Sequence, residues 1–156
     1  LRDFLRSVLL RPVVIRAYWT IPGARRAHHA YPGGFAVHNL QMARMVASLT
    51  DIPHYERELG IAYALTHDYG KIHCYTVPGA EPTDPRTHEI VGRIQLADDL
   101  KALMARDLDL GARMAELIGG PRAGRVGAFP LAIGQIVRSF DQMSCEQERR
   151  RRGLDH

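Results

Sequence analysis

Apolar side chains recur along most of this chain at the three- and four-residue spacing that places them on one face of a helix. The first ten residues show the pattern, with apolar side chains at Leu1, Phe4, Leu5, Val8 and Leu9. No segment alternates apolar and polar residues for long enough to require a strand. The pattern therefore predicts an all-α protein, a helical bundle of about five to seven helices.

Segments with prolines and glycines separate the predicted helices. Residues 21–34 and 70–85 are expected to be loops because these helix breakers gather there. Asp51 and Asp109 are expected to cap the helices that follow them. Whether the predicted helix over residues 86–106 is broken near residues 98–99 stays open. The helices are expected at residues 1–10, 13–19, 35–49, from the Asp51 cap to about 67, 86–106, from the Asp109 cap to Gly119–Gly120, and 130–148.

The length of 156 residues suits one domain. We expect a single domain over residues 1–148 and a basic C-terminal tail over residues 149–156, which is either solvated or a phosphate-binding arm. Hydrophobic residues make up 46% of the chain, which excludes a disordered protein, and no apolar run is long enough to cross a membrane. Because the first residue is Leu1, the chain could belong to a longer protein with further domains.

The cysteines indicate a reducing compartment. Cys74 and Cys145 are the only two, and they fit neither a C-x-x-C motif nor the spacing of zinc ligands. We therefore expect a cytoplasmic protein. A disulfide between these two residues stays open.

Three separate helices are predicted to contribute metal-ligating side chains. His38 lies on the apolar face of its helix, and His67 and Asp68 are adjacent at the end of the next one. Adjacent residues point about 100° apart, so both reach one ion only if it lies just beyond the helix end. Asp141 borders the apolar face of the last helix, where a carboxylate without a partner is costly. Such a mixed nitrogen and oxygen site suits Mn²⁺, Fe²⁺, Ni²⁺, Co²⁺ or Mg²⁺ better than structural Zn²⁺.

These residues resemble the ligand set of the HD-domain metal-dependent phosphohydrolases. Residues 65–71, LTHDYGK, are similar to the family signature L-x-H-D-x-G-K, and residues 28–38, HHAYPGGFAVH, are similar to the stretch HH-x-Y-x-GG-L-x-x-H. The longer stretch is typical of the HD modules of bacterial 3′-to-5′ exoribonucleases and of conjugative relaxase or helicase proteins. The resemblance covers residues 1–148 and implies an HD-domain helical bundle.

The resemblance also implies roles for single residues. The four residues His38, His67, Asp68 and Asp141 would hold the ion, and Asp68 would also take part in catalysis by orienting a water. Lys71 would attract a substrate phosphate as a second catalytic residue. His88 would bind a second metal ion or the substrate, or would simply begin its helix.

Other basic side chains are candidates for contact with substrate phosphate. His28 and His29 precede the His38 helix in a loop, where they line the mouth of a pocket, contact phosphate or order the loop. Gly33 and Gly34 allow a tight turn and a close backbone approach there. In the loop before the last helix, Arg122 and Arg125 either contact phosphate or belong to the charged surface.

The sequence departs from the family at residues 118–121, IGGP, where two-metal members carry a further histidine. We therefore expect one ion, or a weak second site. Two functions stay open: hydrolysis of a phosphoester of a nucleotide or a single-stranded nucleic-acid end through a metal-activated water, or a catalytically weakened module that binds nucleotide or nucleic acid within a larger conjugation or RNA-processing protein. The third interpretation is a helical domain whose polar residues only satisfy one another.

Overall fold

The computed structural model describes residues 1–26, 28–76, 83, 86–120 and 130–153. The regular secondary structure in these ranges is helical, which confirms the predicted all-α fold. Seven helices have eight residues or more, and α5 is a single four-residue turn. No helix in the described ranges is both long and apolar enough to cross a membrane. The helices are α1 Arg2–Leu9, α2 Pro12–Thr20, α3 Gly34–Ala47, α4 His54–Thr66, α5 Lys71–Cys74, α6 His88–Arg106, α7 Leu108–Gly119 and α8 Ala132–Arg151.

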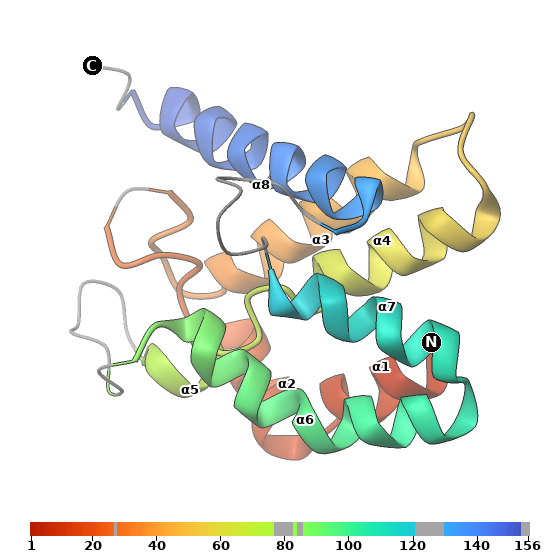
Figure 1. Ribbon diagram of the computed structural model, residues 1–156. Coiled ribbons are helices and arrows are strands. Elements are labelled where there is room, and N and C mark those ends of the chain that lie inside the picture. Colours follow the sequence, from red (N-terminus) through yellow and green to blue (C-terminus); the bar gives the residue numbers. More distant parts are fainter. Residues whose placement is uncertain (27, 77–82, 84–85, 121–129, 154–156) are drawn as a thin grey trace.

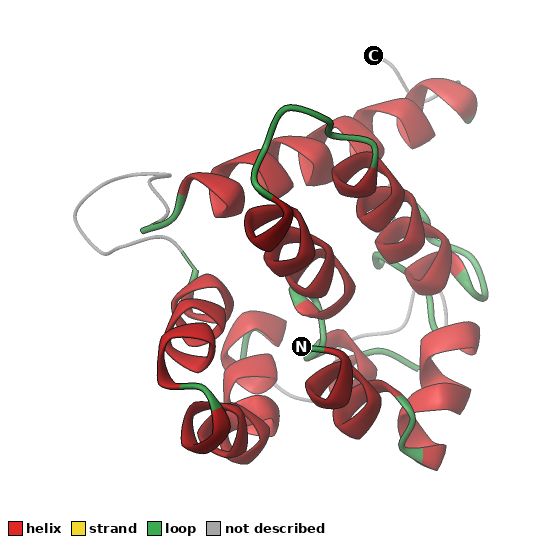
Figure 2. Ribbon diagram, turned by 90° about the vertical axis from the view of Figure 1, so that its right-hand side faces the viewer, coloured by secondary structure: helices red, strands yellow, loops and turns green. Residues whose placement is uncertain are grey.

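The helices form two groups around a shared core (Figure 1). In the first group, α3, α4 and α8 contact one another. In the second, α6 and α7 form a hairpin, α1 and α5 contact α6, and α2 contacts α1 and α5. Figure 2 shows that the described residues contain helices and loops. Contacts between α4 and α7 and between α2 and α3 join the groups. Fully buried side chains from both groups fill the core, among them Phe35, Met42, Leu59, Leu96 and Met114.

The start of α3 depends on two glycines, as the sequence predicted. Gly33 has a φ of +78°, a left-handed conformation that glycine adopts without strain. At Gly34, the first residue of α3, a Cβ would overlap the carbonyl oxygen of His29. The loop therefore folds back directly onto the helix start, and this brings His29 close to His38.

The segment after α4 differs from its prediction. Residues 70–85 were expected to form a loop, but α5 begins at Lys71, where the backbone N–H donates to the carbonyl of Asp68 at 2.8 Å. This turn packs closely against α6, because a Cβ on Gly70 would overlap the carbonyl oxygen of His88. The close approach of two backbones places the residues between α4 and α5 beside the start of α6.

Several helix ends also differ from their predictions. The cap of α7 is Asp107, whose side chain accepts from the N–H of Leu110 at 3.0 Å, and the predicted cap Asp109 lies in the first turn. Helix α4 begins after Pro53 rather than after Asp51. In both cases the residue before the helix has a non-helical backbone, with ψ at 140° for Pro53 and at 101° for Asp107, and this sets the boundary.

The two longest helices extend through segments that the sequence left uncertain. Helix α6 is continuous, and Asp99 accepts two hydrogen bonds of 2.7 Å from Arg11. Helix α8 continues to Arg151, so the first three arginines of the expected basic tail form its last turn. No disulfide joins Cys74 to Cys145.

Candidate metal centre

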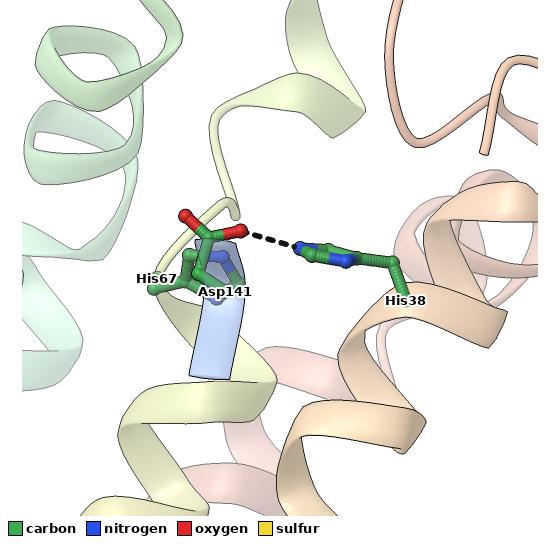
Figure 3. Close-up of side chains that lie close together, drawn as sticks. All are labelled: His38, His67 and Asp141. Carbon is green, nitrogen blue, oxygen red and sulfur yellow. Dashed lines mark ion pairs between the residues drawn. The ribbon is translucent and has the colours of Figure 1, made fainter. Parts of the chain in front are cut away.

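Side chains from three parts of the chain converge at one point (Figure 3). His38 lies on α3, His67 directly follows α4, and Asp141 lies on α8. One ligand atom of each lies within 4.8 Å of the other two, which is close enough for all three to bind one ion. Between His38 Nε2 and Asp141 Oδ1 the distance is 3.2 Å. We call these three residues the ligand triad; the mutual packing of α3, α4 and α8 assembles it.

Hydrogen bonds behind His38 determine which ring nitrogen faces the triad. Ser144 is fully buried, and its hydroxyl donates to Gln41 Oε1 at 2.9 Å. Its lone pairs are thus left to accept from His38 Nδ1 at 3.1 Å and from His29 Nε2 at 3.2 Å. Because Nδ1 of His38 carries the proton, Nε2 presents its lone pair toward Asp141.

His67 has the same orientation for a different reason. Its Nδ1 lies 2.9 Å from the carbonyl oxygen of Ala64, which can only accept, so Nδ1 donates. Its Nε2 is buried and has no hydrogen-bond partner among the described residues. That atom lies 3.3 Å from Asp68 Oδ2, another acceptor.

The triad fits a divalent metal ion. Each histidine turns an unprotonated nitrogen toward a carboxylate oxygen, so acceptor faces acceptor, and a cation between the groups would satisfy both. Burial alone would lower the pKa of His67, but the charge of Asp68 raises it, which shows how strongly the site favours positive charge. Burial would raise the pKa of Asp141, yet the neighbouring His38 and His67 lower it. Two imidazole nitrogens and one carboxylate suit Mn²⁺, Fe²⁺, Co²⁺ or Ni²⁺.

Asp68, the predicted fourth ligand, lies beside the triad. Its Oδ2 is 3.3 Å from His67 Nε2 and 3.9 Å from His38 Nε2, but it does not belong to the mutually close set among the described residues. Burial would raise its pKa, and the charges of His67 and Lys71 nevertheless hold that pKa well below its usual value. A role for Asp68 as a ligand therefore stays a prediction.

Lys71, predicted to attract a substrate phosphate, has partners within the protein. It is 8% exposed, and its ammonium donates to Asp68 Oδ2 at 2.6 Å and to the carbonyl of Gly23 at 2.7 Å. Burial would lower its pKa, but Asp68 raises it, so the side chain stays charged. Two of its three donors are thus used within the protein, and its first function is to hold Asp68 and the loop before α3 in place.

His88 contacts the other carboxylate oxygen of Asp68, because both triad histidines face Oδ2 and His88 faces Oδ1. Its Nε2 is 3.1 Å from Asp68 Oδ1 and 3.3 Å from Glu89 Oε1. The predicted position of His88 near a second metal or substrate site is compatible with these contacts, and Glu89 is a group that the sequence interpretation did not include.

A cavity of about 570 Å³ is lined by two residues of the triad, His67 and Asp141. His28, predicted to face substrate, lines it, and so do Gly119 and Gly120. His29 does not line it: this residue is 1% exposed, and its Nδ1 lies 3.3 Å from the hydroxyl of Tyr31. Burial lowers the pKa of His29 to about 4, so it is a neutral part of the hydrogen-bond network rather than a phosphate contact. Arg122 and Arg125 lie outside the described residues.

Sequence reasoning missed other residues of the cavity wall. Besides Glu89, they are Tyr63, Arg93, Arg138 and Cys145. Helical spacing could have indicated three of them, because Tyr63 precedes His67 by four positions, Arg138 precedes Asp141 by three and Cys145 follows it by four. Cys145 contacts the triad directly, with its Sγ 3.7 Å from Asp141 Oδ1.

Comparison with family models, with curated proteins and with solved structures found no match for this chain.

Proposed function

We propose that the protein is a metal-dependent phosphohydrolase of the HD-domain type, which hydrolyses a phosphoester of a nucleotide or of a nucleic-acid end. The observation that carries the proposal is the ligand triad, in which His38 and His67 turn unprotonated nitrogens toward carboxylates at the inner end of a cavity. The sequence signatures around residues 28–38 and 65–71 support the same assignment.

The residues of the chain have distinct parts in this proposal. His38, His67 and Asp141 would hold the ion, with Asp68 as a further ligand. When bound, a divalent ion supplies acid activation of a water and draws negative charge from the phosphoryl oxygens. Asp68 stays ionised and is positioned by Lys71 and His88, so it can orient the water and accept its proton. The cavity accommodates the phosphoryl group beside these residues.

Metal content and turnover test the proposal. The protein is purified, its bound metals are measured by elemental analysis, and it is loaded separately with Mn²⁺, Fe²⁺, Ni²⁺, Co²⁺ and Mg²⁺. We expect release of phosphate or nucleotide from a panel of nucleotides, cyclic nucleotides and single-stranded oligonucleotides. His67→Ala and Asp68→Ala should abolish it, and His54→Ala, which changes an exposed histidine on α4, should not. A metal-loaded protein that is inert on the whole panel would contradict the proposal.

One observation favours a second function, that of a binding module. Gly119 and Gly120 line the cavity, and they stand where two-metal members of the family that the sequence resembles carry a histidine, so they offer no side-chain ligand to a second ion. A site with one ion could bind nucleotide or nucleic acid without hydrolysing it, within a larger conjugation or RNA-processing protein. This function predicts binding that weakens with salt and no turnover in the same assays.

A further inference from the structure

Two arginines line the cavity, and neither pairs with a side chain in the part of the chain that the structure describes. Arg93 lies on α6, four residues after Glu89, and Arg138 lies on α8, three residues before Asp141. Both are exposed, and neither forms a hydrogen bond or an ion pair with a described residue. Other arginines of the described chain, such as Arg11 and Arg151, have carboxylate partners.

The nearby carboxylates are already engaged with other groups. Glu89 faces His88 at 3.3 Å, and Asp141 faces His38 at 3.2 Å. Asp68 pairs with Lys71. The two guanidinium groups therefore present free donors to whatever enters the cavity.

The charges of the cavity wall are balanced before a metal ion is counted. Among the described lining residues, the three carboxylates Asp68, Glu89 and Asp141 match the three cations Lys71, Arg93 and Arg138. As neutral imidazoles, the lining histidines His28, His67 and His88 add no charge. Tyr63 and Cys145 add none either, because burial raises the pKa of both side chains. A divalent ion in the triad thus leaves an excess of two positive charges, which complements a dianion.

A terminal phosphomonoester has that charge, whereas an internal phosphodiester carries a single negative charge. The monoester also has three non-ester oxygens. If one oxygen faces the metal, two remain, one for each guanidinium, while a diester leaves only one. Arginine binds such oxygens through its planar fork of N–H donors, often in pairs.

We propose that Arg93 and Arg138 form a two-arginine clamp that makes this site selective for a terminal phosphomonoester over a phosphodiester. The inference rests on the proposed function and specifies its substrate class. The terminal phosphate of a free nucleotide and that of a nucleic-acid strand have the same chemistry at the clamp.

Binding of an unreactive analogue tests the clamp separately from catalysis. The Mn²⁺-loaded protein is titrated by calorimetry with phenylphosphonate, at a pH where it is a dianion, and with its monoethyl ester, which is a monoanion. We expect the dianion to bind at least about 10-fold more tightly, since charge-assisted hydrogen bonds contribute about 1.5–3 kcal/mol each. Arg93→Gln and Arg138→Gln should each weaken phenylphosphonate binding by about 10-fold or more and should reduce the preference over the ester.

Two controls make the outcome specific. Arg44→Gln removes an exposed arginine on α3 that does not line the cavity, and it should leave both affinities unchanged. Mn²⁺ affinity is measured for each variant, and it should be unchanged in Arg93→Gln and Arg138→Gln. To separate the two sources of phosphate, a nucleoside 5′-phosphonate and an oligonucleotide with a 5′-terminal phosphonate are then compared.

The outcomes separate the clamp from the metal centre. Unchanged phenylphosphonate binding in both glutamine variants, with Mn²⁺ bound, overturns the clamp and leaves the proposed function standing. Equal affinity of the wild-type protein for the dianion and the monoanion overturns the selectivity for monoesters. A wild-type protein that binds no metal ion overturns the proposed function, and the charge argument for the clamp fails with it.

Discussion

The two sides of the cavity are built differently. On the side of α3, α4 and α8, hydrogen bonds set the orientation of both triad histidines: Ser144 does so for His38, and the Ala64 carbonyl does so for His67. On the side of α6 and the end of α7, the side chains of His88 and Glu89 are 23% and 59% exposed, and a Cβ on Gly119 would meet nothing within 4 Å. Metal ligands need a fixed geometry, whereas a substrate needs room and long polar side chains to reach it. Under the proposed function, the first side would hold the ion, and the open second side, together with Arg138 of α8, would select the substrate.

The largest effect is expected where the two sides meet, at Lys71. In Lys71→Ala the buried Asp68 loses its cation, and the carbonyl of Gly23 loses its donor. Breaking a buried ion pair on one side costs about 3–5 kcal/mol, so the free energy of unfolding should fall by that amount in urea denaturation. The matched control is Lys101→Ala, which removes the only other lysine from an exposed pair with Asp98 and should cost less than about 1 kcal/mol. Equal losses in both variants would show that Lys71 does not hold the two sides together.

Removing a triad residue should weaken metal binding next most strongly. His67→Ala deletes one of three ligand atoms. We expect the Mn²⁺ affinity to fall by more than about 100-fold, because changing even a residue that only hydrogen-bonds to a ligand lowers metal affinity by about 10- to 100-fold. Calorimetric titration with Mn²⁺ measures it, with His54→Ala on the same helix as the control. His67→Gln keeps a polar side chain, so a similar loss in this variant would come from the missing imidazole and not from a general loss of structure. An unchanged Mn²⁺ affinity in both His67 variants would show that the triad does not bind the ion.

The network behind His38 should have a smaller effect. Ser144→Ala leaves the Nδ1 of His38 and the Nε2 of His29 without their shared acceptor. Groups that orient a ligand contribute about 10- to 100-fold to metal affinity, and we expect a loss in that range. Nitrogen-15 NMR of the His38 ring should show the proton leaving Nδ1 for part of the population. Ser139→Ala on the same helix, where the hydroxyl only donates to the Gln135 carbonyl, should change neither quantity.

The smallest effect should come from the open side. Gly119→Ala adds a methyl group where nothing lies within 4 Å, at the last residue of α7. Alanine is favoured over glycine in helices by about 0.5–1 kcal/mol, so the free energy of unfolding should rise by up to that amount. Gly70→Ala is the counterpart on the packed side and should be destabilising, because its Cβ would overlap the backbone of His88. If Gly119→Ala is destabilising, the side of the cavity formed by α6 and the end of α7 is as tightly packed as the side formed by α3, α4 and α8.

Much of the fold could be predicted from periodicity, and the errors have a common cause. Apolar faces such as Phe35, Met42 and Val46 follow helical spacing because burial of one helix face stabilises the helix, and all three are fully buried. The boundaries depend on more distant contacts. The turn at α5 exists because Gly70 packs against α6, and no local pattern indicates a neighbour that lies nearly twenty residues further along the chain.

The candidate site was also predictable only in part. His38 and Asp141 were found because polar residues on apolar faces need partners, and the structure brings both to His67. The position of Lys71 was indicated by the signature, but its pairing with Asp68 and Gly23 was not. Arg93 gave no signal, because exposed arginines occur on most helices of this chain, and Arg138 gave only its three-residue spacing from Asp141.

The sequence by itself determined that the chain is helical and which buried faces carry histidine and aspartate, since both follow from the spacing of apolar residues along a helix. Only the tertiary structure decided which ring nitrogen each histidine presents and which cations stay without a carboxylate partner. Those properties depend on hydrogen-bond acceptors and charges that come from other helices, and the packing of the helices alone brings them within reach.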